Sequence, residues 1–195
     1  MWDQLISIDR SILLLINASG GPFMDHIMLL FSAKWIWIGL YVVLFFLIKR
    51  TLGLKTTAIL LLFVGLMILV TDQLSVHLFK EQFERLRPCH NSLIKDQLIL
   101  VAGKCGGQFG FVSSHATNTM GLVIFISMAM RKYWRNGPLI LVSWSLLVGV
   151  SRVYIGVHYP SDVFFGWLFG ALVGLCFANM YLTVLTKLSF VWLKK

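Results

Sequence analysis

The chain has 195 residues, of which 58% are hydrophobic and 13% are charged. A soluble domain carries about 25% charged residues, so this composition excludes an ordinary soluble protein and indicates an integral membrane protein. The formal net charge is +9 at pH 7, but the basic residues are scattered between apolar runs and form no basic and aromatic stripe, which argues against nucleic-acid binding. No hydrophilic block is long enough for a second soluble unit, so we expect residues 1–195 to form a single membrane-embedded domain.

The N-terminal region contains two apolar stretches, 4–17 and 22–32, separated by a Gly-Gly-Pro sequence. They predict either interfacial helices or one more, broken, membrane span. The region carries Asp3 and Asp9 instead of a basic head, and no clear small-residue cleavage site follows its first apolar run. We therefore expect no cleaved signal peptide.

The rest of the chain contains apolar stretches close to the roughly 20 residues that cross a bilayer core. A shorter stretch at about 34–49 has tryptophans at one end and basic residues at the other, which are typical interfacial anchors. The clear stretches lie at about 56–79, 115–131, 137–155 and 161–186. We therefore expect an all-α integral membrane bundle of five or six transmembrane helices.

Basic residues gather in three segments that these spans place on one side of the membrane. By the positive-inside rule that side is cytoplasmic. The long loop 80–114 and the turn 156–160 then face the opposite, exoplasmic side. The basic segments contain Lys49, Arg50 and Lys55, then Arg131, Lys132 and Arg135, and finally Lys187, Lys194 and Lys195.

The loop 80–114 is the longest connection, and long loops in compact bundles are commonly functional. It carries several cations that the positive-inside rule disfavours on that side, so we interpret them in part as an anion site. Cys89 and Cys105 lie in the same loop. They could form a disulfide if the loop faces an oxidising compartment, although the spacing does not require it.

The first polar cluster on this side is KEQFERLRP, at 80–88. Lys80 and Arg87 are seven residues apart, so on a continuing helix they would share one face. Pro88 would then stop or turn the helix. A simpler interpretation is a pair of interfacial cations whose stems lie along apolar surface.

The second cluster is VSSHA, at 112–116. Ser113 or Ser114 is well placed as the N-cap of the following membrane helix. The free N–H groups of a helix N-terminus can bind an anion, and His115 would stand beside it. The alternative is a capped helix with an incidental histidine.

The third cluster is SRVYIGVHYPSD, at 151–162. Arg152 falls near the end of an apolar span, where an unpaired charge is costly, so it needs an anionic partner. Pro160 can begin the last helix, which puts Asp162 in its first turn. A carboxylate four residues after His158 can fix the tautomer of the ring and leave its other nitrogen as a nucleophile. Alternatively, Asp162 simply complements the helix dipole.

In order, spacing and sidedness, the three clusters closely resemble the signature of the type 2 phosphatidic acid phosphatase and haloperoxidase superfamily. The resemblance covers about 72–165. The chain departs from the usual pattern at Val112 and Ser114, where the family has proline and glycine. The residues that carry the resemblance are Lys80, Arg87, Pro88, Ser113, His115, Ser151, Arg152, His158 and Asp162.

This resemblance implies a helical-bundle phosphatase with a covalent phosphohistidine intermediate. His158 would attack phosphorus and Asp162 would orient it. His115 would protonate the leaving oxygen. We expect no metal and no cofactor, because phosphoryl transfer needs mainly positioning and charge stabilisation, and the exoplasmic side offers few clustered oxygen ligands. The phosphate-binding set would be Lys80, Arg87, Ser113, Ser114 and Arg152, with nearby backbone N–H groups.

These observations together predict a membrane lipid phosphate phosphatase, in a bacterial inner membrane with its site facing the periplasm or exterior. Its partners would be a lipid phosphate substrate and membrane lipids. Undecaprenyl diphosphate is the first expectation, and phosphatidylglycerol phosphate, phosphatidic acid and lipid A are alternatives that no residue distinguishes. A vanadate-dependent haloperoxidase and a non-catalytic lipid-phosphate binder are alternatives of other classes. The sequence does not indicate an oligomeric state.

Two further ionisable residues, Asp72 and His77, lie within or near the end of the second expected crossing. Ionisable groups at membrane depth are candidates for function. Asp72 could lie two turns from Lys80 and organise the cations, or it could pair with His77. The remaining histidines, His26 and His90, have no motif support.

Overall fold

The computed structural model describes residues 2–192, and helices make up most of this range, with no β-strand in it. This confirms the predicted all-α architecture. In chain order the helices are α1 (Trp2–Ile16), α2 (Gly21–Ser32), α3 (Ile38–Leu52), α4 (Leu54–Leu74), α5 (Glu81–Phe83), α6 (Ser114–Ala129), α7 (Gly137–Tyr154) and α8 (Pro160–Trp192). Shorter helical turns lie at Lys34–Trp37, Ser75–Lys80, Pro88–His90 and Lys95–Gln97.

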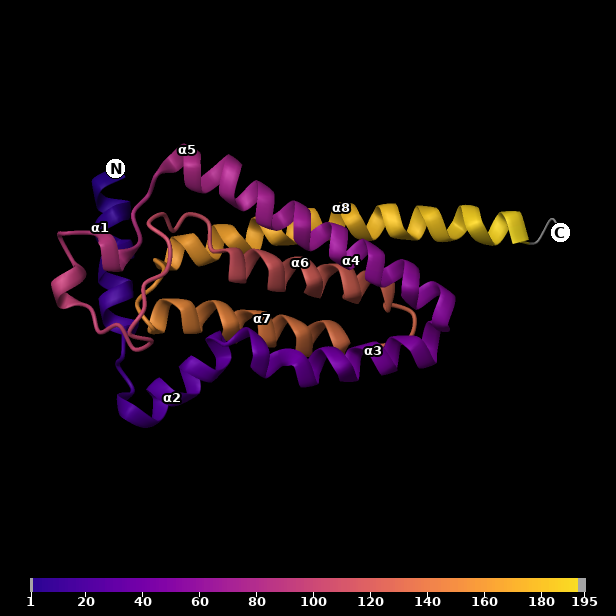
Figure 1. Ribbon diagram of the computed structural model, residues 1–195, viewed down its shortest axis with the longest axis horizontal. Coiled ribbons are helices and arrows are strands. Elements are labelled where there is room, and N and C mark those ends of the chain that lie inside the picture. The colour runs from indigo at the N-terminus through magenta and orange to yellow at the C-terminus, as the bar shows by residue number, and fades with distance from the viewer. Residues whose placement is uncertain (1, 193–195) are drawn as a thin grey trace.

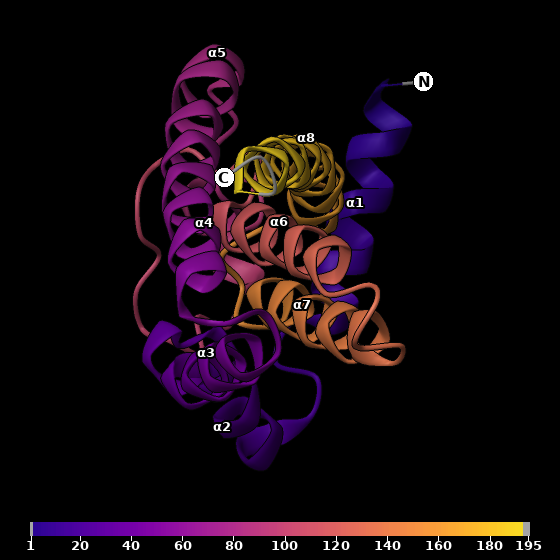
Figure 2. The same ribbon diagram turned by 90° about the vertical axis from the view of Figure 1, so that its right-hand side faces the viewer.

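Helix α6 lies in the middle of the bundle, with α4, α7 and α8 packed around it (Figures 1 and 2). Its contact with α8 is very close, because small residues of α8 face the α6 backbone. A Cβ atom at Gly170 would lie 2.1 Å from the backbone oxygen of Thr117, and one at Gly174 would lie 2.5 Å from that of Gly121. These glycines therefore set the distance between the two helices.

Gly170→Ala should lower the free energy of unfolding by about 1–3 kcal/mol, because the added methyl group must push α6 and α8 apart. The measurement is the melting temperature of the purified protein in detergent. Gly65→Ala is the matched control, since a Cβ at Gly65 would meet no heavy atom within 4 Å. Equal melting temperatures for the two variants would contradict this account of the helix contact.

Four helices of the described range are long and apolar enough to cross a membrane. The bent pair Gln4–Ile16 and Gly21–Ser32, with 114° between its halves, would be a fifth if it forms one span. The span expected at 115–131 is not among the four, because α6 has 16 residues. It packs against α4, α7 and α8. The four helices are Lys34–Leu52, Leu54–Phe83, Gly137–Tyr154 and Pro160–Leu188.

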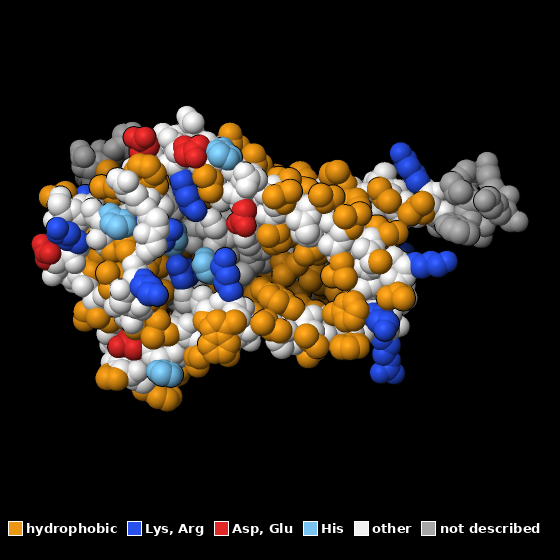
Figure 3. Space-filling view, viewed as in Figure 1, with side chains coloured by type: hydrophobic (Ala, Val, Ile, Leu, Met, Phe, Trp, Pro, Cys, Tyr) orange, Lys and Arg blue, Asp and Glu red, His pale blue; other side chains and the backbone are white. Residues whose placement is uncertain are grey.

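The two ends of the bundle differ in what they carry. The turn between α3 and α4, the loop between α6 and α7 and the C-terminal part of α8 lie at one end (Figure 1). Lys and Arg side chains gather at that end in Figure 3. The long loop between α5 and α6 and the turn between α7 and α8 lie at the other end. Of the basic residues expected on one side, Lys194 and Lys195 lie outside the described residues.

Candidate active site

A pocket of about 470 Å³ lies at the end of the bundle that carries the long loop. Basic and histidine side chains gather in a hollow of this face, beside a broad apolar surface (Figure 3). Six of the eight predicted site residues line the pocket, from three separate parts of the chain. They are Lys80, Arg87, Ser114, His115, Arg152 and His158.

Lys80 and Arg87 both line the pocket, but the backbone between them is not the continuous helix that the sequence predicted. The helix that carries Lys80 ends at Phe83, and Glu84 has a left-handed backbone with φ of 45°. The expectation of one continuing helix ending at Pro88 is therefore wrong. The chain leaves the helix at this residue, and Arg87 nevertheless lines the same pocket as Lys80.

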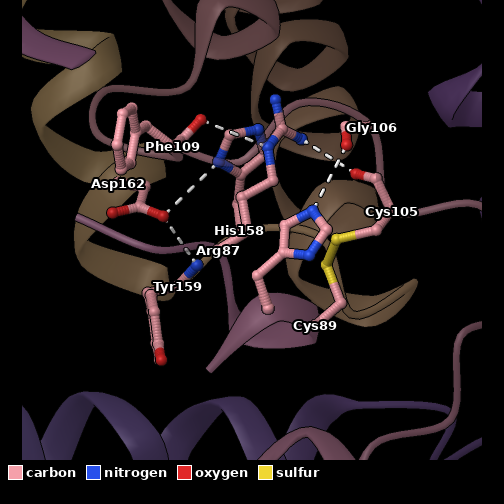
Figure 4. Close-up of a disulfide and its surroundings, with 9 residues drawn as sticks. Arg87, Cys89, Cys105, Gly106, Phe109, His158, Tyr159 and Asp162 are labelled. Atoms are coloured by element: carbon pink, nitrogen blue, oxygen red, sulfur yellow. Dashed lines mark hydrogen bonds and ion pairs between the residues drawn. A yellow bond between two sulfur atoms is a disulfide. The ribbon is translucent and has the colours of Figure 1, made fainter. Parts of the chain in front are cut away.

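Arg87 is held by the backbone of the same long loop. Its Nε and Nη1 donate hydrogen bonds of 3.3 Å to the carbonyl oxygens of Phe109 and Cys105 (Figure 4). A disulfide joins Cys89 to Cys105, with 6.0 Å between the Cα atoms. The disulfide that the sequence left open is therefore present, and it closes the loop around the guanidinium.

His158 lies in the turn between α7 and α8 and is only 2% exposed. Its Nδ1 is 3.4 Å from Oδ2 of Asp162, which also accepts a 3.0 Å hydrogen bond from the Tyr159 N–H (Figure 4). Burial lowers the pKa of His158 well below 6.5, and the nearby guanidinium groups of Arg87 and Arg152 lower it further. The ring is therefore neutral at pH 7, the state that a nitrogen nucleophile needs.

The start of α6 meets the start of α8 beside this pair. The backbone N–H of Ser113 donates to the carbonyl oxygen of Asp162 at 2.9 Å. Ser113 occupies the predicted N-cap position, but its buried Oγ makes no capping bond and has no partner among the described residues. Ser114 lines the pocket instead, and its Oγ accepts a 2.8 Å hydrogen bond from Lys80 Nζ. His115 follows in the first turn.

Arg152, near the end of α7, does not have the anionic partner that its position predicted. Its Nη1 donates to the hydroxyl of Ser32 in α2. Within residues 2–192, no carboxylate forms a salt bridge with it, and its Nε is buried without a partner. The charge of this guanidinium is therefore available to an anion in the pocket.

Asp72 lines the pocket with Lys80 and accepts a 2.8 Å hydrogen bond from Asn118. The alternative of a buried pair with His77 is wrong, because the exposed His77 ring contacts Glu81 at 2.8 Å. Asp72 is thus placed near the cations, as the helical spacing suggested.

Several residues in or next to the site were not predicted from the sequence. Lys34 and Tyr41 line the same pocket from the segment that begins the first long span. Lys34 is a fourth cation there, and nothing in its local sequence distinguishes it from an interfacial anchor. Arg85 forms an ion pair with the carboxylate of Asp162 at 2.7 Å. Its neighbours in the sequence gave no sign of this contact.

Comparison with known proteins decides the family. Residues 57–185 match the PAP2 superfamily. The chain belongs to the PAP2 superfamily. It is 33% identical over 178 residues to a lipid A 4'-phosphatase of Bacteroides thetaiotaomicron, covering 91% of this chain and 78% of the relative. It is 36% identical over 186 residues to a lipid A 4'-phosphatase of Porphyromonas gingivalis, covering 92% and 75%.

Solved structures share the fold of this PAP2 protein. A transmembrane PAP2 phosphatidylglycerolphosphate phosphatase from Bacillus subtilis has a TM-score of 0.68 and 22% identity, over 91% of this chain and 86% of that one. Aquifex aeolicus LpxE has a TM-score of 0.63 and 22% identity, over 87% and 93%. The family and the fold together make the protein a membrane lipid phosphatase of the PAP2 type, as the motif resemblance implied.

Proposed function

We propose that this PAP2 phosphatase removes a phosphate group from lipid A or a closely related phosphorylated glycolipid. The observation that carries the proposal is the similarity to two lipid A 4'-phosphatases over more than nine tenths of the chain. An undecaprenyl-diphosphatase of Sulfolobus acidocaldarius matches only 33% of the chain, at 35% identity. The lipid A alternative therefore has more support than undecaprenyl diphosphate, the first expectation.

The reaction would begin with attack of the free ring nitrogen of His158 on phosphorus. Asp162 would hold the other nitrogen and stabilise the charge that develops on the ring. The bond from phosphorus to the lipid oxygen breaks, and His115 gives a proton to the leaving lipid alcohol. The bound phosphate favours the protonated form of His115, because it places negative charge beside the ring.

In the second half of the reaction, neutral His115 would remove a proton from a water molecule. The water oxygen attacks phosphorus, the nitrogen to phosphorus bond breaks, and inorganic phosphate leaves with His158 restored. The guanidinium groups of Arg87 and Arg152 and the ammonium group of Lys80 would hold the phosphoryl oxygens in both steps. Such preorganised charge is the main requirement of phosphoryl transfer.

The pocket would face the periplasm of a bacterial inner membrane. The basic segments gather at the opposite end of the bundle, which the positive-inside rule makes cytoplasmic. The disulfide between Cys89 and Cys105 fits an oxidising compartment on the pocket side. The apolar surface beside the hollow in Figure 3 would let the acyl chains stay in the bilayer while the phosphate enters the pocket.

The substrate is tested by phosphate release in detergent from a panel of lipid A, phosphatidylglycerol phosphate, phosphatidic acid and undecaprenyl diphosphate. We expect the highest kcat/KM on lipid A. A preference for the diphosphate or for a glycerol-linked phosphate would overturn the glycolipid assignment and leave the PAP2 chemistry intact.

Activity should persist in excess EDTA. Mg²⁺ is bound in proteins mainly through carboxylate and other oxygen ligands. Among the described residues that line the pocket, one has a carboxylate, Asp72, and that carboxylate already accepts a hydrogen bond from Asn118. The measurement is phosphate release with and without EDTA after dialysis. Complete loss of activity that added Mg²⁺ restores would contradict the proposed mechanism.

A further inference from the structure

The carboxylate of Asp162 is fixed at both of its oxygens. Oδ2 faces the His158 ring and accepts the Tyr159 N–H. Oδ1 accepts a 2.7 Å hydrogen bond from Nη1 of Arg85, in the segment after α5. Asp162 is fully buried, so its negative charge needs a compensating partner.

Arg85 is itself held by the N-terminal helix. Its Nη2 contacts Oδ2 of Asp9 in α1 at 2.5 Å, and its Nη1 also donates to the Ser161 hydroxyl at 2.6 Å. The hydroxyl and backbone N–H of Ser161 donate to Asp9 at 2.6 and 2.9 Å. The guanidinium carbon lies 4.2 Å from the centre of the Tyr159 ring. The guanidinium group of Arg85 is thus held by the two carboxylates, by the Ser161 hydroxyl and by the Tyr159 ring.

This arrangement separates Arg85 from the cations of the pocket. Arg85 does not appear among the residues that line the pocket, whereas Lys80, Arg87 and Arg152 do. Its Nη1 atom binds the Asp162 carboxylate in α8, and its Nη2 atom binds the Asp9 carboxylate in α1. A planar guanidinium can make both contacts at once, and a lysine ammonium group cannot reproduce that geometry.

We propose that Arg85 is a positioning residue of the reaction. It keeps the Asp162 carboxylate facing the His158 ring, and Asp9 in turn keeps the Arg85 guanidinium in place. Helix α1 is then part of the catalytic apparatus. The inference rests on the proposed role of His158 as the nucleophile. Because Arg85 acts through Asp162, it should affect turnover and leave phosphate binding unchanged.

Arg85→Met should lower kcat about 100-fold, as loss of a group that orients a catalytic residue commonly does. KM for the lipid phosphate, and the inhibition constant of orthovanadate as a phosphate mimic, should change by about threefold or less. Arg85→Lys should recover part of the lost kcat, because lysine restores the positive charge but cannot bind both carboxylates as the planar guanidinium does. A parallel rise of KM and of the vanadate constant would overturn the proposal, since it would show that Arg85 binds phosphate.

Asp9→Asn tests the outer half of the network and nearly preserves the side-chain shape. We expect about a tenfold lower kcat, with KM unchanged. The matched control is Asp96→Asn, an exposed carboxylate in the long loop, which should keep the normal kcat. If Arg85→Met does not fold, Asp9→Asn and Arg85→Lys decide the question. Normal kcat in both would overturn the proposal.

A double-mutant cycle separates positioning from a general loss of structure. In the Asp162→Asn background, Arg85→Met should cause no further loss of kcat, because Arg85 then has no carboxylate to hold. Additive losses would overturn the proposal. Failure of the proposed function itself looks different, since His158→Ala would then retain activity whatever the Arg85 variants do.

Discussion

His158→Ala is expected to reduce phosphate release by at least about 10⁴-fold, because it removes the atom that forms the covalent bond to phosphorus. Inhibition constants for orthovanadate should stay within about tenfold of the normal value, since the cations of the pocket remain. The two measurements together separate loss of chemistry from loss of the binding site.

His26→Ala is the matched control, because His26 is an exposed histidine of α2 outside the pocket. It should keep full activity. A second check is acid quenching during turnover of a lipid carrying a labelled phosphate. Label should remain on the normal protein and be absent from His158→Ala. Substantial turnover by His158→Ala would refute the phosphohistidine mechanism.

His115→Ala should lower kcat on a lipid phosphate by about 10² to 10⁴-fold, the usual contribution of a positioned general acid. A lipid alcohol is a poor leaving group, so it needs a proton as the bond to phosphorus breaks. The defect should shrink on a soluble aryl phosphate with an acidic phenol as leaving group, because the phenolate can leave without that proton. The orthovanadate constant should change little.

The decisive comparison is the ratio of kcat for the normal protein and His115→Ala on the two substrates. A general acid predicts a much smaller ratio on the aryl phosphate. An equal ratio on both substrates would instead assign His115 to phosphate binding. Thr119→Ala is a useful companion, since Thr119 also lines the pocket and its hydroxyl donates a 2.8 Å hydrogen bond to the backbone carbonyl of His115. It should cause a much smaller defect than His115→Ala.

The pocket at this end of the bundle contains more basic than acidic side chains. Lys80, Arg87 and Arg152 line one pocket together, and Asp72 is the only carboxylate among its described lining residues. Mutual repulsion makes such a cluster unfavourable until an anion enters. Carbonyl and hydroxyl groups of the loop and of α2 hold the guanidinium groups in place meanwhile. The pocket therefore carries excess positive charge, which favours the binding of phosphate.

Local features of the sequence predicted much of this molecule. Apolar length predicted the long helices, and Pro160 marked the first residue of α8. The four-residue spacing of His158 and Asp162 predicted their contact, because that distance joins a turn to the first turn of the next helix. The spacing of the three motifs indicated the family and six of the residues that line the pocket.

Tertiary structure alone decided the partners of those residues. Arg85 and Asp162 are 77 positions apart, and Asp9 and Ser161 are 152 apart. Such contacts depend on how whole helices pack, which no local pattern encodes. The helix that carries Lys80 ends before Arg87, at the left-handed Glu84, and Ser114, not Ser113, lines the pocket. The sequence by itself determined which chemical groups are present and on which elements, and packing determined which of them meet.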